Sequence, residues 1–155
     1  MAAIFMDSNE HFRRETQRLM EMDGSFERLV RFGEIYAGYY GGKDLAYIRA
    51  RQILYLKDAS GRVSTQNFTP PNILVAIVEQ GQRDSTLRTD LPARELAMYL
   101  SIMLKGFTAE WCEMNGGFDL NSALRGGFRI ALDGARLLPV EGADEKGTAG
   151  MTGGP

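Results

Sequence analysis

The fold class is decided by residues 92–138, which read PARELAMYLSIMLKGFTAEWCEMNGGFDLNSALRGGFRIALDGARLL. Apolar side chains recur in this stretch every three or four residues, as they do on one face of an α-helix. The pair Gly116–Gly117 interrupts the pattern, and glycine is the residue that most often ends a helix. The stretch therefore predicts two helices, a long one over residues 92–114 and a last one over residues 119–138, capped by Asp119.

The N-terminal part of the chain predicts four shorter helices by the same periodicity. Each is preceded by a residue that can cap a helix, namely an aspartate, a serine, or a threonine followed by proline. These helices are expected over residues 7–22, 25–41, 44–57 and 70–81. The third has apolar residues around most of its circumference, which predicts a central position in the domain.

Together these elements predict an all-α domain of about six helices over residues 1–138. The segments over residues 58–68 and 82–90 are polar and are expected to form loops. The last stretch, residues 139–155, combines glycine and charge with almost no apolar side chains, so we expect a disordered tail.

The composition is that of an ordinary globular domain, with 44% hydrophobic and 25% charged residues in a chain of 155. The net charge of -2 and the mixing of acidic with basic side chains argue against DNA binding by this chain alone. No apolar run reaches the ~20 residues that span a membrane, and the first ten residues do not resemble a signal peptide. We expect a cytoplasmic protein with no membrane contact.

Residues suited to catalysis or metal binding are scarce. The only histidine, His11, is expected on the solvated side of the first helix, and the single cysteine, Cys112, is interpreted as a small buried residue. The motifs HExxH, GxSxG, CxxC and the Walker loop do not occur. Acidic pairs such as Glu110 and Glu113 are interpreted as solvated side chains of amphipathic helices. We therefore expect no enzyme, no metal site and no cofactor.

Aromatic and methionine side chains are the most distinctive feature of the predicted helices. Most are expected in the core, but four tyrosines fall between positions 36 and 47, and a buried phenol needs a hydrogen-bond partner that a ligand can supply. Methionine adapts to varied shapes, which suits a loosely selective pocket. The candidate lining residues of a pocket for a small, largely apolar ligand are Tyr36, Tyr40, Tyr47, Tyr55, Met103 and Phe107.

Several short motifs follow one another from residue 79 onward. They are Glu79–Gln82, the link Leu87–Asp90, and Gly106 followed by Trp111 in the long helix, with a helix rich in small residues after them. In this order and spacing they resemble the C-terminal ligand-binding and dimerisation domain of tetracycline-repressor-type (TetR family) transcriptional regulators. The resemblance covers about half of the chain, and the upstream helices fit it in number and spacing.

The resemblance implies a sensing domain that binds a ligand among its second, third, fourth and fifth helices and forms a homodimer. The last two helices would pair with those of a second copy as a four-helix bundle, and small residues on the last helix favour such close packing. The candidate interface residues are Trp111, Leu124, Phe128, Ala131 and Ala135. The alternative is that these residues pack inside one subunit.

The family's DNA-binding unit is missing from this stretch of sequence. A helix-turn-helix needs roughly 45 residues and a basic recognition helix, which the residues before Asp7 do not supply. DNA would be contacted only through a helix-turn-helix outside this chain. Other functions stay open, namely an enzyme on a helical bundle, a stand-alone dimeric interaction module with a fully packed interior, and a small-ligand binder with no DNA role.

Overall fold

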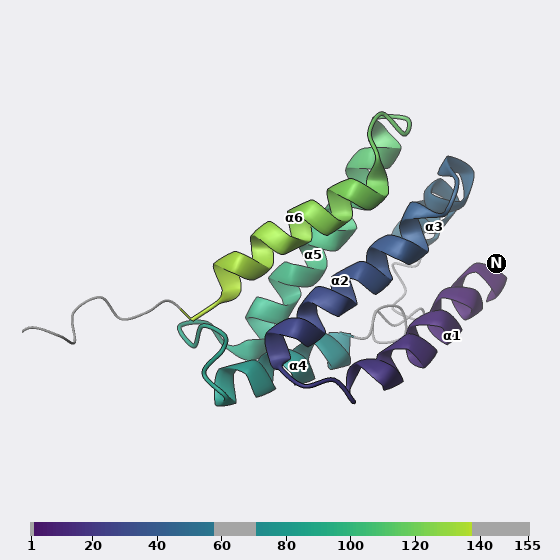
Figure 1. Cartoon of the computed structure of the whole chain (residues 1–155). Coiled ribbons are helices and arrows are strands. Elements are labelled where there is room, and N and C mark those ends of the chain that lie inside the picture. The colour runs from purple at the N-terminus through teal and green to yellow at the C-terminus, as the bar shows by residue number, and fades with distance from the viewer. Residues whose placement is uncertain (1, 58–70, 138–155) are drawn as a thin grey trace, which may run out of the picture.

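A computed structural model describes residues 2–57 and 71–137 of the chain (Figure 1). The described residues form six α-helices, which confirms the all-α prediction. They are α1 (Ala2–Leu19), α2 (Ser25–Gly41), α3 (Leu45–Lys57), α4 (Pro71–Arg83), α5 (Ala93–Glu113) and α6 (Leu120–Ala135). The predicted loop over residues 58–68 and the predicted tail over residues 139–155 lie outside the described residues.

The helices pack as a bundle in which α2 lies between its neighbours. Figure 1 shows α2 running beside α6 on one side and beside α1 on the other, and α2 also contacts α4 and α5. Its buried side chains include Leu29, Phe32 and Ala37. The prediction that the third helix is central was therefore wrong, since α3 packs mainly against α5 and leaves Leu56 exposed.

Aspartates at two predicted caps hold helix starts as expected. The Asp119 carboxylate accepts a hydrogen bond from the backbone N–H of Ser122 at 2.6 Å, and the Asp44 carboxylate accepts one from the N–H of Tyr47 at 2.8 Å. Each bond satisfies a backbone donor that the first turn of a helix leaves without a partner.

The predicted start of the first helix was wrong. The helix begins at Ala2, so that Asp7 and the fully buried Ser8 lie within it and not at its start. No glycine or proline interrupts residues 2–6, so nothing stops the helix from extending upstream. Glu10, which lies in the middle of this helix, forms an ion pair with Arg13 at 2.7 Å.

Two other helix ends differ from the prediction. The fourth helix continues past Gly81 to Arg83, because Gly81 faces the packed side chain of Leu87; a Cβ atom there would lie 2.5 Å from Leu87 Cδ1. The last helix ends at Ala135 and not at residue 138, because the backbone after it turns to pair with the α4–α5 connection.

The α4–α5 connection fastens the end of α6. The backbone N–H of Arg88 donates to the carbonyl of Ala135 at 2.9 Å, and that of Leu137 donates to the carbonyl of Thr86 at 3.1 Å. The Gln82 side-chain amide donates to the carbonyl of Arg88 at 2.9 Å. Residues of the motifs Glu79–Gln82 and Leu87–Asp90 therefore hold the connection and the last helix together.

Candidate functional site

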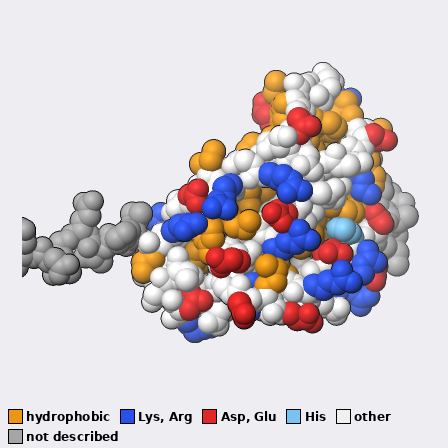
Figure 2. All heavy atoms as spheres, in the orientation of Figure 1, with side chains coloured by type: hydrophobic (Ala, Val, Ile, Leu, Met, Phe, Trp, Pro, Cys, Tyr) orange, Lys and Arg blue, Asp and Glu red, His pale blue; other side chains and the backbone are white. Residues whose placement is uncertain are grey.

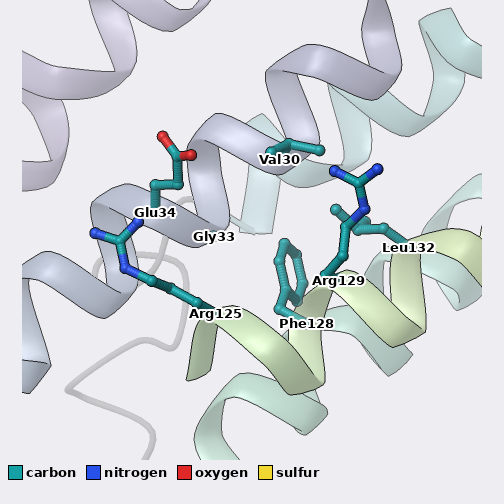
Figure 3. Close-up of a pocket in the computed structure, with 7 residues that line it drawn as sticks. All are labelled: Val30, Gly33, Glu34, Arg125, Phe128, Arg129 and Leu132. Carbon is teal, nitrogen blue, oxygen red and sulfur yellow. The ribbon is translucent and has the colours of Figure 1, made fainter. Parts of the chain in front are cut away.

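A cavity of about 170 Å³ lies between α2 and α6, as Figure 3 shows. Val30 and Gly33 of α2 and Phe128 and Leu132 of α6 form its apolar walls. Gly33 makes the close crossing possible, because a Cβ atom at this position would lie 2.2 Å from Cδ1 of Phe128. The absence of a side chain at residue 33 thus lets the Phe128 ring form the back of the cavity.

Charged side chains form the rim of this cavity. Figure 3 shows Arg125 and Arg129 on either side of the Phe128 ring, with Glu34 opposite on α2. Each has a partner outside the cavity. The Arg125 Nε donates to the Asn121 side-chain oxygen at 2.8 Å, Glu34 pairs with Arg31 at 2.8 Å, and Arg129 pairs with Asp133 at 3.5 Å.

The wider α2–α6 surface is mixed in charge. Figure 2 shows acidic and basic side chains interleaved on the face of the molecule that α2 and α6 form. The guanidinium groups of Arg129 and Arg136 lie 5.4 Å and 3.8 Å from the ring of Phe26. The three side chains of these cation–π contacts also line a second hollow of about 330 Å³, together with Met22.

A polar groove of about 430 Å³ lies between α1 and α2. The Tyr39 hydroxyl donates to the Asp7 carboxylate at 2.8 Å and lies 2.8 Å from the Tyr47 hydroxyl. The Lys43 ammonium lies 3.4 Å from Asp7 and over both tyrosine rings. The bond from Tyr39 holds the pKa of the Asp7 carboxyl below its usual value, and burial, with hydrogen bonds to Tyr47 and Asp7, raises the pKa of the Tyr39 phenol.

Two of the predicted ligand-binding tyrosines lie in the packed core. Tyr36 and Tyr40 are 1% and 0% exposed, and their ring centroids are 4.5 Å apart. Phe12 of α1 packs against Tyr36 at 5.9 Å. The Tyr47 hydroxyl lies 2.8 Å from the hydroxyl of Tyr39, whose ring packs against Tyr40 at 4.8 Å. Contact of these phenols with a ligand stays a prediction.

The other predicted ligand-binding residues lie elsewhere. Phe107 packs against α6, where a Cβ atom at Gly127 would lie 2.1 Å from its Cζ. Met103, one turn earlier on α5, is 39% exposed. The side chain of Tyr55 lies outside the described part of the structure. The structure therefore brings Tyr36 and Tyr40 together but sets Met103 and Phe107 apart from them, on the side of α5 near α6.

Three of the predicted interface residues face the interior of a single chain. Leu124, Phe128 and Ala135 are buried at 0%, 2% and 2% exposure, and Phe128 lies against Gly33 of α2. The apolar stripe on the last helix was identified correctly, but it packs within the subunit. In the single chain the side chains of these three residues are already covered, and their part in a dimer interface stays a prediction.

The other two predicted interface residues are partly buried. Trp111 donates its indole N–H to the carbonyl of Phe118 at 2.8 Å and packs against the α5–α6 turn at Gly116. Ala131 lies at the edge of the core. Both residues thus border the outer surface of α5 and α6 without forming its centre.

That outer surface carries exposed apolar side chains that sequence reasoning missed. Ile102 on α5 and Ile130 on α6 are 56% and 74% exposed, and Tyr99 and Met103, which lie one helical turn apart on α5, are exposed as well. Three glycines of the same two helices are also open to solvent, because a Cβ atom at Gly106, Gly126 or Gly134 would have no neighbour within 4 Å. We call the four apolar residues and these three glycines the α5–α6 face.

The described residues contain no group of His, Cys, Asp or Glu placed to hold a metal ion. None of the described helices is long and apolar enough to cross a membrane. No family model matches the sequence, and no curated protein or solved structure is significantly similar to it.

Proposed function

We propose that this chain is the small-molecule-sensing and dimerisation domain of a TetR-like transcriptional regulator and acts without catalysis. A helix-turn-helix outside this chain would contact DNA. The observation that carries the proposal is the α5–α6 face, which is apolar and rich in glycine on the two helices that the resemblance assigns to pairing. Solvent-exposed apolar patches of this kind mark surfaces for protein association.

The size of the α5–α6 face suits a two-fold dimer. Helices of 21 and 16 residues are about 31 and 24 Å long at 1.5 Å per residue. Two such helices about 10 Å apart present roughly 500–600 Å² per copy, and two copies together bury on the order of the 1,000 Å² that a specific interface needs. Open glycines on both helices let a second copy approach closely.

Light scattering after gel filtration tests the pairing. The parent chain is expected to be a dimer at tens of micromolar, and Ile130→Arg and Ile102→Arg are expected to shift it to a monomer, because each places a charge without a partner in the interface. Met20→Arg is the matched control, since Met20 is 43% exposed and directly follows α1, a helix that packs mainly against α2. A monomeric parent chain, or a dimer that survives both isoleucine changes, contradicts the proposed pairing.

The alternative to a sensing domain is a stand-alone interaction module that binds no small molecule. The close stacking of Tyr36 and Tyr40 in the core favours such a module, whereas the α2–α6 cavity favours a ligand binder. Thermal melts with panels of small organic compounds separate the two, because a ligand that binds only the folded form raises the melting temperature. A sensing domain responds to a chemical class of compound, and an interaction module responds to none.

A further inference from the structure

We infer that the α2–α6 cavity binds a small organic carboxylate with an apolar body, such as a one-ring aromatic acid or a short branched acid. This inference rests on the sensing part of the proposed function and does not depend on the pairing. It assigns the ligand to a place other than the tyrosines Tyr36, Tyr40 and Tyr47.

The dimensions of the cavity limit the ligand to a small molecule. Its volume of about 170 Å³ is below the ~300–1,000 Å³ of pockets that enclose drug-sized molecules. The walls are apolar, with the Phe128 ring at the back and Val30 and Leu132 beside it. A flat ring or a branched chain can contact these walls, whereas a strongly hydrated ligand gains nothing from them.

Arg125 is held in position to meet an anion. Its Nε donates to the Asn121 oxygen at 2.8 Å, and the Asn121 amide donates to the carbonyl of Ala37 on α2 at 3.1 Å. The guanidinium is thereby oriented by a neutral side chain that is itself tied to the opposite helix. The terminal nitrogens Nη1 and Nη2 form the end-on fork that pairs with a carboxylate through two hydrogen bonds.

The charges at the rim suit a single negative charge. Arg125 and Arg129 give two positive charges and Glu34 gives one negative charge, so the sum over the lining residues is +1. The Glu34 carboxylate already pairs with Arg31 at 2.8 Å, which offsets part of its negative charge. Glu34 is nevertheless the one lining group that would favour a cation, and it therefore provides the sharpest test.

Benzoate is the probe for this site, with benzamide as the uncharged molecule of the same shape and benzylamine as the cationic one. Amide NMR spectra of the ¹⁵N-labelled chain are recorded during titration. We expect benzoate to bind with a Kd on the order of 1 mM, as is usual for a ligand of this size. The largest shifts are expected around Gly33 and residues 125–132, and benzamide is expected to bind at least about tenfold more weakly.

Three variants sharpen the test. Arg125→Gln is expected to weaken benzoate binding about tenfold or more because it removes the charge-assisted bonds, and Arg83→Gln, at the end of α4, is the control expected to change nothing. Glu34→Gln is expected to strengthen benzoate binding severalfold because it removes a repelling charge. The circular dichroism of each variant checks that it is folded.

Several results would overturn the inference. They are equal binding of benzamide and benzoate, preferential binding of benzylamine with loss in Glu34→Gln, and full benzoate binding by folded Arg125→Gln. If benzoate changes amide chemical shifts only in another part of the domain, the carboxylate site is wrong but the proposed sensing function is not contradicted. If none of the three probes changes the spectra and no compound of the wider panels changes the melting temperature, both the carboxylate site and the sensing function are contradicted.

Discussion

Replacing Gly33 with alanine tests the α2–α6 crossing that shapes the cavity. The added Cβ atom would lie 2.2 Å from Cδ1 of Phe128, a distance at which one of the two groups must move. The Phe128 side chain is 2% exposed and is therefore enclosed by its neighbours. Overpacking of this kind costs ~1–3 kcal/mol, while the change from glycine to alanine inside a helix contributes about 1 kcal/mol in the opposite direction.

Gly38 on the same helix provides the matched control. A Cβ atom at this position would have no neighbour within 4 Å, so Gly38→Ala is expected to raise the free energy of unfolding by up to about 1 kcal/mol. Gly33→Ala is expected to lower it by up to ~2 kcal/mol once the two opposing effects are added. The two variants should thus differ by about 1–3 kcal/mol.

Urea unfolding measures this difference by linear extrapolation to zero denaturant. The parent and both variants are compared at several matched protein concentrations, because pairing would make stability depend on concentration. If Gly33→Ala stabilises the protein as much as Gly38→Ala does, the two helices do not cross at the distance described. The α2–α6 cavity would then lose its back wall, and the inferred carboxylate site would lose its geometry.

Ser25→Ala is expected to lower the melting temperature by about 2–4 °C, because it removes the hydrogen bond of 2.8 Å that a buried hydroxyl donates to Asp84; Ser122→Ala, an exposed serine near the start of another helix, should change it little. Acidification is expected to destabilise the fold: the Thr86 hydroxyl and Ser25 lower the pKa of Asp84, and the backbone N–H of Ser122 lowers that of Asp119. Their contribution is present above the unfolded-state pKa of about 3.9 and is lost as the pH falls below it. Urea midpoints from pH 6 to pH 2 check this, and midpoints that rise on acidification would contradict it.

The number and order of the helices could be predicted because their signals are local. Glycines, prolines and capping aspartates act within a few residues, and Asp119 caps α6 as its position in the sequence suggests. The start of α1 could not be predicted in this way, because a short polar side chain looks the same in the local sequence whether it caps a helix or lies inside one. Ser8 is fully buried, a property set by packing of α1 against α2.

The direction in which an apolar stripe faces could not be predicted from periodicity. Leu124 and Phe128 share a stripe that would look the same if it packed on a second copy or on a helix of its own chain. The choice depends on Gly33, which lies far away in the sequence and leaves room for Phe128. Ile102 and Ile130 were not predicted to belong to an interface, because single apolar residues on a polar face are common.

The cavity itself depends on contacts between distant parts of the chain. Arg125 and Arg129 would be read from the sequence as solvated residues of an amphipathic helix. Their position at the rim follows from the crossing of α2 and α6, which also brings the Ala37 carbonyl within 3.1 Å of the Asn121 amide. A charged side chain beside a cavity is therefore a property of the assembled bundle.

The turn between α5 and α6 gives this protein an internal optical reporter. The chain has a single tryptophan, and the Trp111 indole is fixed by its bond to Phe118 at 2.8 Å at the border of the outer α5–α6 surface. Indole fluorescence depends on the polarity of its surroundings, so emission from the unlabelled chain comes from this one place. Opening of the turn, or its burial by a second molecule, can thus be followed in real time without attaching a dye.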